Sequence, residues 1–217
     1  MAVFNLVSFD LQGVEDSVVC QHMAAVHFYT DSIEKKDCNY QAYQCNSLKD
    51  FEAGNCLGCS ARGCNRMGHW ASPNNDLGTL YFTTQGADKY PYCYTHYKIK
   101  ATPNNLSGQS QSRGTVTVSF SGSKGVSGNF IIEDDTGIFN TNTILQGIGE
   151  ADKDIGEIQS ARVTFRRANC LLTCFLLDDK WSFKTLEITN GQTQQTVKLC
   201  PSQNFITSDS TVTFNLC

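Results

Sequence analysis

The chain has 217 residues, enough for one large domain or two small ones. Its hydrophobic share of 40% and charged share of 18% are typical of a globular protein and argue against disorder. The formal net charge of -4, without clustered Lys and Arg, argues against nucleic acid binding, and no apolar run reaches the roughly 18 residues that a membrane span needs.

Eleven cysteines, mostly at close spacings among Gly, Asn and Ser, indicate an oxidising compartment and therefore a secreted, extracellular protein. Residues 1–19 do not have the pattern of a signal peptide, because no cation precedes the apolar residues and Asp10, Glu15 and Asp16 interrupt them. We therefore expect the sequence to begin inside a longer secreted protein.

The first predicted element is a helix that follows His22. A histidine has a near-neutral pKa that suits general base catalysis, although a lone histidine is more often structural. We interpret His27, His69 and His96 as structural. The helix is predicted from apolar residues at helical spacing, which are Met23, Val26, Tyr29 and Ile33.

A short helix is predicted over Leu48–Ala53. Ser47 with Asp50 three residues later resembles a capping box at the start of a helix. Gly54 suits the left-handed backbone conformation that commonly ends a helix. From there to Asp88 the chain is rich in Gly, Asn and Cys, which predicts a disulfide-held loop with one strand near residues 80–84.

After Pro91 the chain changes to short alternating runs bounded by turn residues, the pattern of an all-β sandwich. We place the domain boundary there, between residues 1–91 and 92–217. Strands are expected near residues 94–101, 115–120, 129–132, 161–166, 181–188, 195–199 and 211–216, with a bulge between Phe183 and Leu186. The residues expected to face inward are Val116, Val118, Phe120, Ala161, Val163, Phe165, Val212, Phe214 and Leu216.

One cysteine pattern has two interpretations. Cys56, Cys59, Cys64 and His69 form C-x2-C-x4-C-x4-H, which resembles a zinc knuckle. The alternative is a set of disulfides that also uses Cys45, and we favour it because the remaining cysteines and the all-β region fit the extracellular class. We therefore expect neither a metal site nor a cofactor.

Three stretches together resemble the pancreatic lipase family. The run from Cys20-Gln-His22 to Asp31-Ser-Ile33 is similar to the segment around that family's catalytic histidine, with Gln21 where the family commonly has Asn. The cysteine-rich run from residue 43 to residue 70 resembles the segment that follows it. Phe120-Ser-Gly-Ser-Lys-Gly125 is similar to a strand and turn of the family's C-terminal PLAT domain.

The resemblance covers the chain from about residue 13 to its end and implies a mixed fold. Residues 1–91 would be the C-terminal remnant of an α/β-hydrolase catalytic domain, and residues 92–217 a PLAT or lipoxygenase-like β-sandwich. His22 would be the catalytic triad base, and Cys20 would close a lid loop. The implied disulfides are Cys45 to Cys56, Cys59 to Cys64 and Cys200 to Cys217.

No G-x-S-x-G motif for a nucleophilic serine occurs in the 217 residues. We therefore expect a C-terminal fragment of a secreted triacylglycerol lipase or phospholipase-like carboxylic ester hydrolase that is not competent alone. Its sandwich would contact a lipid interface or a colipase-like protein. One alternative is a short non-enzymatic extracellular product that binds lipid or protein, and a zinc-knuckle nucleic-acid binder is a distant one.

Some features stay open at this stage. Ile138-Phe139 and Leu171-Leu172 are candidate contacts with lipid, although each also suits the sandwich core. Without a sheet supplied by the rest of the family's catalytic domain, the helix after His22 would expose an apolar face. Asn105-Leu-Ser107 is a glycosylation sequon in a predicted loop. The cysteines with no assigned partner are Cys20, Cys38, Cys93, Cys170 and Cys174, so at least one is free or intermolecular.

Overall fold

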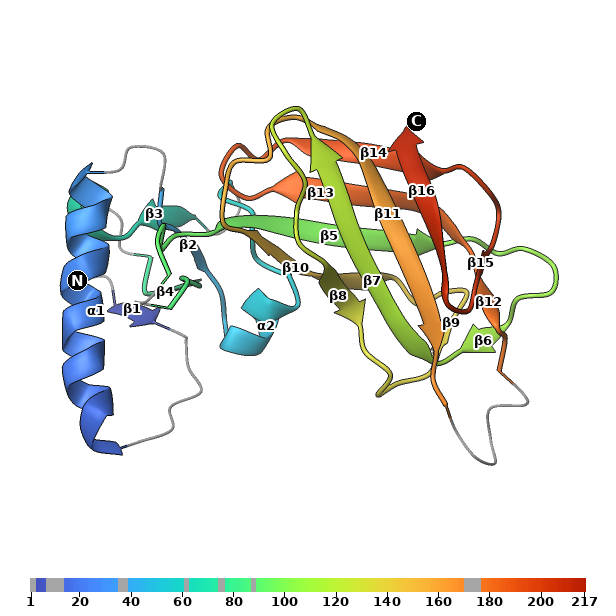
Figure 1. The fold of residues 1–217 in the computed structure, drawn as a ribbon, viewed down its shortest axis with the longest axis horizontal. Helices are drawn as coiled ribbons and strands as arrows, with labels where there is room; N and C mark the ends of the chain where they lie inside the picture. Colours follow the sequence, from blue (N-terminus) through green and yellow to red (C-terminus); the bar gives the residue numbers. More distant parts are fainter. Residues whose placement is uncertain are drawn as a thin grey trace. The chain divides into compact units, whose positions relative to one another are not determined.

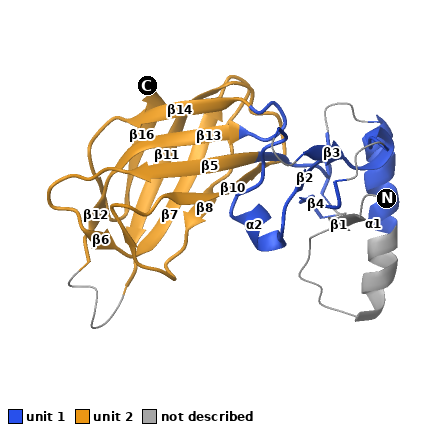
Figure 2. Cartoon of the chain, turned by 180° about the vertical axis from the view of Figure 1, so that it is seen from behind, with its two compact units in different colours: residues 1–96, 190–194 blue, residues 97–189, 195–217 orange. Residues whose placement is uncertain are grey.

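The structure is a computed structural model that divides into two compact units (Figure 2). One unit comprises residues 1–96 and 190–194, and the other comprises residues 97–189 and 195–217. The structure describes residues 3–6, 14–34, 39–60, 63–73, 77–86, 89–169 and 177–217, with side chains described from residue 23 onward.

The first unit is a small four-stranded sheet with one long helix (Figure 1). The strand order is β1-β4-β2-β3, in which β1 and β4 are parallel and the other neighbours are antiparallel. Its elements are β1 (Val3–Leu6), α1 (Val14–Glu34), β2 (Gln41–Gln44), α2 (Leu48–Glu52), β3 (Cys64–Arg66), the 3-10 helix η1 (Gly68–Trp70) and β4 (Thr79–Phe82).

A compact apolar cluster holds α1 onto this sheet. It consists of Phe28 from the helix, Tyr40, Ala42 from β2, and Leu80 and Phe82 from β4, all of them buried. The Phe28 ring lies 6.3 Å from that of Tyr40, and the Tyr40 ring lies edge-on to Phe82 at 6.4 Å. Burial of such aromatic side chains is the main source of stability in a unit of this size.

The predicted short helix is confirmed as α2. The Ser47 side chain accepts a hydrogen bond from the Asp50 backbone N–H at 3.1 Å, which is the expected N-cap contact. Gly54 follows the C-cap with a φ of 67°, a conformation that glycine adopts readily.

The second unit is a β-sandwich (Figure 1). Its main sheet has eight strands in the order β10-β5-β13-β14-β16-β11-β7-β8, and two short two-stranded sheets, β12-β15 and β6-β9, accompany it. The elements are β5 (Thr95–Pro103), β6 (Gln111–Ser112), β7 (Gly114–Gly122), β8 (Phe130–Glu133), β9 (Phe139–Asn140), β10 (Leu145–Ala151), β11 (Ile158–Arg167), β12 (Lys180–Trp181), β13 (Phe183–Asn190), β14 (Thr196–Pro201), β15 (Ile206–Thr207) and β16 (Ser210–Leu216).

The core of the sandwich is built from alternate residues of each strand. Val163 on β11 lies between Val118 on β7 and Val212 on β16, and all three are buried. Tyr97 on β5 packs from the opposite layer, with its ring 4.8 Å from that of Phe120. These registers confirm the predicted fold class of a mixed segment followed by an all-β sandwich.

Several expectations about strands were incomplete or wrong: the short strands β1, β2, β3, β6 and β9 were not predicted, and β3 lies in the stretch that was expected to be a loop. Leu216 is 61% exposed because it is the last residue of β16 and lies beyond the packed core, so it does not face inward. The strand β10 was not predicted, because Gly147 and Gly149 weaken its pattern. A Cβ on Gly149 would lie 2.9 Å from the Phe130 ring on β8, so the close approach of these two strands favours glycine there.

In β13, Thr185 and Leu186 are both buried, so the alternation of burial breaks between them, whereas the predicted bulge stays a prediction. Within the described residues, no helix is both long enough and apolar enough to cross a bilayer.

Candidate functional site

The proposed base, His22, lies inside α1 and not at its start. The helix begins at Val14, eight residues earlier, so the expected helix after His22 was placed too late. The prediction relied on apolar spacing from Met23 onward and gave no weight to positions 15 and 16, where acidic residues suit the first turn of a helix. The side chains of Cys20 and His22 lie outside the described part of the structure.

One face of α1 is anchored by polar contacts as well as by Phe28. The Tyr40 hydroxyl donates a hydrogen bond of 2.7 Å to the buried Asp31 carboxylate. The Ser32 hydroxyl donates to the Tyr29 carbonyl and accepts the backbone N–H of His69, at 2.6 and 3.0 Å. Burial, followed by the contact with Asp31, raises the pKa of Tyr40 above its ordinary range, so this phenol stays protonated.

The opposite face of α1 is apolar and exposed. The exposed fractions are 49% for Met23, 56% for Val26, 51% for Tyr29 and 45% for Ile33. The family resemblance predicts such an exposed apolar face when the sheet from the rest of the catalytic domain is absent. The spacing that predicted the helix therefore identified its exposed side, whereas Phe28 marks its buried side.

The cysteine-rich segment is cross-linked. Disulfides join Cys45 to Cys56 and Cys59 to Cys64, with Cα separations of 5.5 and 4.9 Å, and these are the pairs that the resemblance implies. A disulfide sulfur is not a thiolate and is therefore not available as a zinc ligand. No group of metal-binding side chains occurs within the described residues, and the zinc-knuckle interpretation does not fit the segment.

The remaining cysteines are described in part. Cys200 on β14 is bonded to Cys217, again the implied pair, with a Cα separation of 5.1 Å. Cys93 is also disulfide-bonded. Cys38, Cys170 and Cys174 lie outside the described residues.

The other histidines have different settings. His96 is buried, and its Nε2 accepts the Thr83 backbone N–H at 3.2 Å and lies 2.8 Å from the Thr83 hydroxyl. Burial lowers the pKa of His96 to about 3, so its ring is neutral at ordinary pH. His69 is exposed and lies edge-on to Trp70, with 4.9 Å between the rings, and His27 is exposed on α1.

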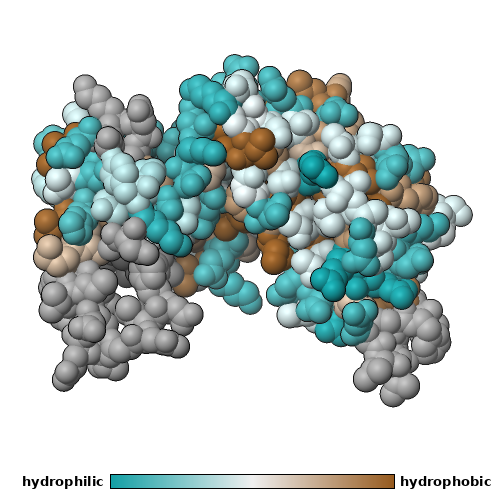
Figure 3. All heavy atoms as spheres, in the orientation of Figure 1, coloured by the Kyte–Doolittle hydropathy of each residue, from teal (hydrophilic) through white to brown (hydrophobic). Residues whose placement is uncertain are grey.

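On the sandwich, the Ile138-Phe139 pair divides between surface and core. Ile138 is 63% exposed, whereas Phe139 is buried against Trp181 with 4.8 Å between the rings. Phe139 is thus a core residue and not a lipid contact. Leu171 and Leu172 lie outside the described residues. Figure 3 shows separate apolar patches on a largely polar surface, and the other exposed aliphatic residues described in this unit are Val126, Ile131, Ile144 and Leu216.

Exposed isoleucines flank the β9 turn. Ile138 directly precedes β9, and Ile144 follows the turn that the Thr143 backbone N–H closes on the Asn140 carbonyl at 2.9 Å. Ile144 is 50% exposed. Ile131 on strand β8 is 61% exposed. The sequence had indicated only the first of these three positions.

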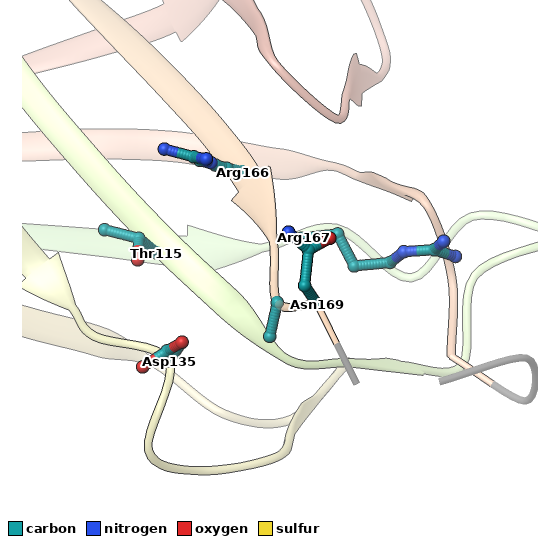
Figure 4. A pocket seen from close by; sticks show the side chains of 6 residues that line it. Thr115, Asp135, Arg166, Arg167 and Asn169 are labelled. Atoms are coloured by element: carbon teal, nitrogen blue, oxygen red, sulfur yellow. The ribbon is translucent and has the colours of Figure 1, made fainter. Parts of the chain in front are cut away.

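A polar cavity of about 210 Å³ lies at the end of β11. The Arg166 and Arg167 side chains point to opposite sides of the strand, and Thr115 lies beside Arg166 on β7 (Figure 4). Arg166 Nε is 3.6 Å from an Asp209 carboxylate oxygen, and Arg167 donates to the Leu177 carbonyl at 3.3 Å. Neither serine nor histidine lines this cavity, so it lacks the groups for triad chemistry; its lining residues are Thr115, Asp135, Arg166, Arg167, Ala168 and Asn169.

Comparison with known proteins agrees with the family resemblance. Residues 5–92 match the family model described as Lipase. Horse (Equus caballus) pancreatic triacylglycerol lipase is 30% identical over 155 residues, which covers 70% of this chain and 32% of that protein. The chain is a relative of the pancreatic lipases.

Other members of the lipase family match more of the chain. The pancreatic triacylglycerol lipase of Ictidomys tridecemlineatus is 29% identical over 210 residues, which covers 95% of this chain and 42% of that protein. Rat (Rattus norvegicus) lipoprotein lipase is 24% identical over 197 residues, covering 88% of this chain and 40% of that protein. The chain thus spans less than half the length of these lipases.

Solved structures of lipoxygenases also match. Coral 8R-lipoxygenase gives a TM-score of 0.43 at 13% identity, covering 55% of this chain and 17% of that chain. A calcium-dependent 11R-lipoxygenase gives a TM-score of 0.37 at 14% identity, covering 56% and 17%. These likenesses are too distant to carry an argument about function.

Proposed function

We propose that this chain is the C-terminal segment of a secreted lipase that hydrolyses carboxylic esters of lipids, either triacylglycerols or phospholipids. The observation that carries the proposal is the 30% identity over 155 residues to a pancreatic triacylglycerol lipase. The close-spaced disulfides support the extracellular location, because such bonds persist in oxidising compartments.

In this proposal His22 is the base of a Ser-His-Asp triad. It would take the proton of the attacking serine and return it to the leaving alcohol of the ester. The serine, the orienting carboxylate and the oxyanion donors would come from a segment that this sequence does not contain. Because triad members act as a unit, His22 without its serine contributes very little to acyl transfer.

The experiment for this step is an assay of the purified 217-residue chain on emulsified triacylglycerol and on phospholipid vesicles. We expect no release of fatty acid above the rate without protein. Turnover that disappears in a His22→Ala variant would overturn the proposal that the chain is incompetent alone. Turnover that survives this substitution would instead reveal a contaminating esterase, and a preparation depleted of it must then be inactive.

The β-sandwich, residues 97–189 and 195–217, is proposed to contact the lipid surface or a colipase-like protein. Ile138 and Ile144, which flank the β9 turn, and Ile131 on β8 are exposed, and apolar side chains of this kind insert into a lipid interface. Each aliphatic side chain that leaves water contributes roughly 1.5 to 3 kcal/mol when fully buried.

Co-flotation with triacylglycerol emulsion tests the lipid contact. We expect the double variant Ile138→Ser with Ile144→Ser to bind at least tenfold less tightly than the unchanged chain. Val126→Ser is the matched control, because Val126 is 57% exposed but pairs beside Ser121, near the other end of β7. An equal loss in both variants, or no loss in either, would contradict a lipid contact at the β9 turn.

The same assays distinguish the lipase proposal from the alternative of a short non-enzymatic protein. A natural product with the mass of the 217-residue chain, which binds vesicles and has no esterase activity in any association, would indicate a short non-enzymatic extracellular protein. A natural product that carries G-x-S-x-G upstream would support the lipase proposal.

A further inference from the structure

We propose that Asn105 is a site of N-linked glycosylation. The inference depends on the proposed secretion, since the modification takes place in the secretory pathway. Asn105-Leu106-Ser107 is the only Asn-X-Ser/Thr sequence with X other than proline among the 217 residues. Because a sequon is common by chance, its position in the folded chain decides whether the enzyme can reach it.

The sequon lies in the connection between β5 and β6, at the surface of the sandwich. Asn105 and Ser107 are both exposed, whereas Gln109 two residues later is buried. Gly108, which directly follows the sequon, has a φ of 82°, a left-handed conformation that glycine adopts readily. A glycan on Asn105 therefore displaces no core residue.

The loop is anchored on both sides of the sequon. Before it, the Asn104 backbone N–H donates to the Ser182 carbonyl at 3.0 Å, and the Asn104 carbonyl accepts from Gln109 Nε2 at 2.9 Å. After it, the Asp178 carboxylate accepts the backbone N–H groups of Ser110 and Gln111, at 2.7 and 3.1 Å.

These hydrogen bonds hold the backbone of the loop, and none of them involves Asn105, Leu106 or Ser107. The folded structure thus tolerates a bulky, hydrophilic group at Asn105 with no loss of an anchoring contact. In contrast, Asn104 is adjacent in sequence but supplies two of the anchoring backbone groups.

The chemical step uses a lipid-diphosphate-linked oligosaccharide as co-reactant and an oligosaccharyltransferase as catalyst. The Asn105 amide nitrogen attacks C1 of the first N-acetylglucosamine and loses one proton, forming an N–C bond. The C1–O bond to phosphate breaks, and the lipid diphosphate leaves with the bonding electrons. No oxidation or reduction is involved.

The test is expression of the full chain behind a secretory signal in animal cells, with samples taken from microsomes and from the medium. We expect a single mass increase that an N-glycosidase removes, leaving Asp in place of Asn105 in the tryptic peptide that runs from Ala101 to Arg113. Asn105→Gln and Ser107→Ala should lose the increase completely, whereas Ser107→Thr and Asn104→Gln should keep it.

A translocated chain whose Cys200–Cys217 disulfide has formed, yet whose peptide is unmodified at Asn105, would overturn the inference. Because microsomes are sampled, a variant that is not secreted still gives a result, and Ser107→Thr supports the site without removing the asparagine. Failure of the lipase proposal is distinguishable: a glycosylated chain that neither binds lipid nor belongs to a longer esterase overturns the function and leaves the site intact.

Discussion

The Tyr40 hydroxyl donates a 2.7 Å hydrogen bond to the Asp31 carboxylate, and this buried contact joins α1 to the segment that leads into β2. Tyr40 also has a φ of 39°, in the left-handed region that is unfavourable for a tyrosine. Ring burial and this hydrogen bond together hold the residue in that conformation, and the proposed base lies on the same helix.

Replacing Tyr40 by phenylalanine should destabilise the first unit by about 1 to 3 kcal/mol, because it keeps the ring but leaves a buried carboxylate without this donor. Native-state hydrogen exchange of the α1 amides measures the effect. Tyr29→Phe is the control, since Tyr29 is 51% exposed on the same helix, and it should change stability by no more than about 0.5 kcal/mol. Equal effects of the two substitutions would contradict the role of the contact.

Stability of the first unit should fall as the pH decreases below 6.5. Burial lowers the pKa of His96 from 6.5 to about 3, so between these values the unfolded chain binds a proton that the folded chain does not. The stabilisation is therefore complete above pH 6.5 and is lost toward pH 3, with a slope of up to about 1.4 kcal/mol per pH unit. The free energy of unfolding is measured by denaturant titration at several pH values.

Other acidic groups also titrate in this range, so the comparison is with His96→Gln. That variant keeps an acceptor for the Thr83 N–H but cannot be protonated, and its pH slope should be smaller than that of the unchanged chain. Identical slopes would show that His96 is not buried as a neutral ring.

Gly149→Ala should destabilise the sandwich by about 1 to 3 kcal/mol, which is the usual range for overpacking. The added Cβ would lie 2.9 Å from the Phe130 ring and 3.0 Å from the Ile99 side chain. Gly128→Ala is the matched control, because nothing lies within 4 Å of a Cβ there. Thermal unfolding followed by circular dichroism gives both values, and a sensitive Gly128 with a tolerant Gly149 would contradict this packing.

The chain should resist a chelator and be sensitive to loss of its disulfides. A chelator should leave the unfolding temperature unchanged, because Cys56, Cys59 and Cys64 are held as disulfides and not as thiolates. Cys200→Ser combined with Cys217→Ser should cost about 3 kcal/mol, the expected effect of removing a cross-link of this span. Zinc that co-purifies in equimolar amount would contradict the first expectation.

Strands were predicted correctly where apolar and polar residues alternate along the sequence. The prediction failed where contact with a neighbouring strand determines which residues fit. The alternation in β7, β11 and β16 is local, so the sequence alone indicated it. In β10 the close approach of Phe130 on β8 favours glycine at position 149, and no pattern in β10 itself indicates that neighbour. The exposed Leu216 illustrates the same limit, since alternation continues past the point at which the core ends.

For the candidate site, the resemblance of the sequence predicted the cysteine pairs and suggested His22 as the base, which stays a prediction, and apolar spacing predicted the helix. Tertiary structure alone decided which side of α1 is buried: Phe28, Asp31 and Ser32 pack, while the regular apolar series from Met23 to Ile33 is exposed. The physical reason is that helix formation depends on residues three or four positions apart, whereas burial depends on Tyr40, Leu80 and Phe82, which the chain brings to the helix from further along.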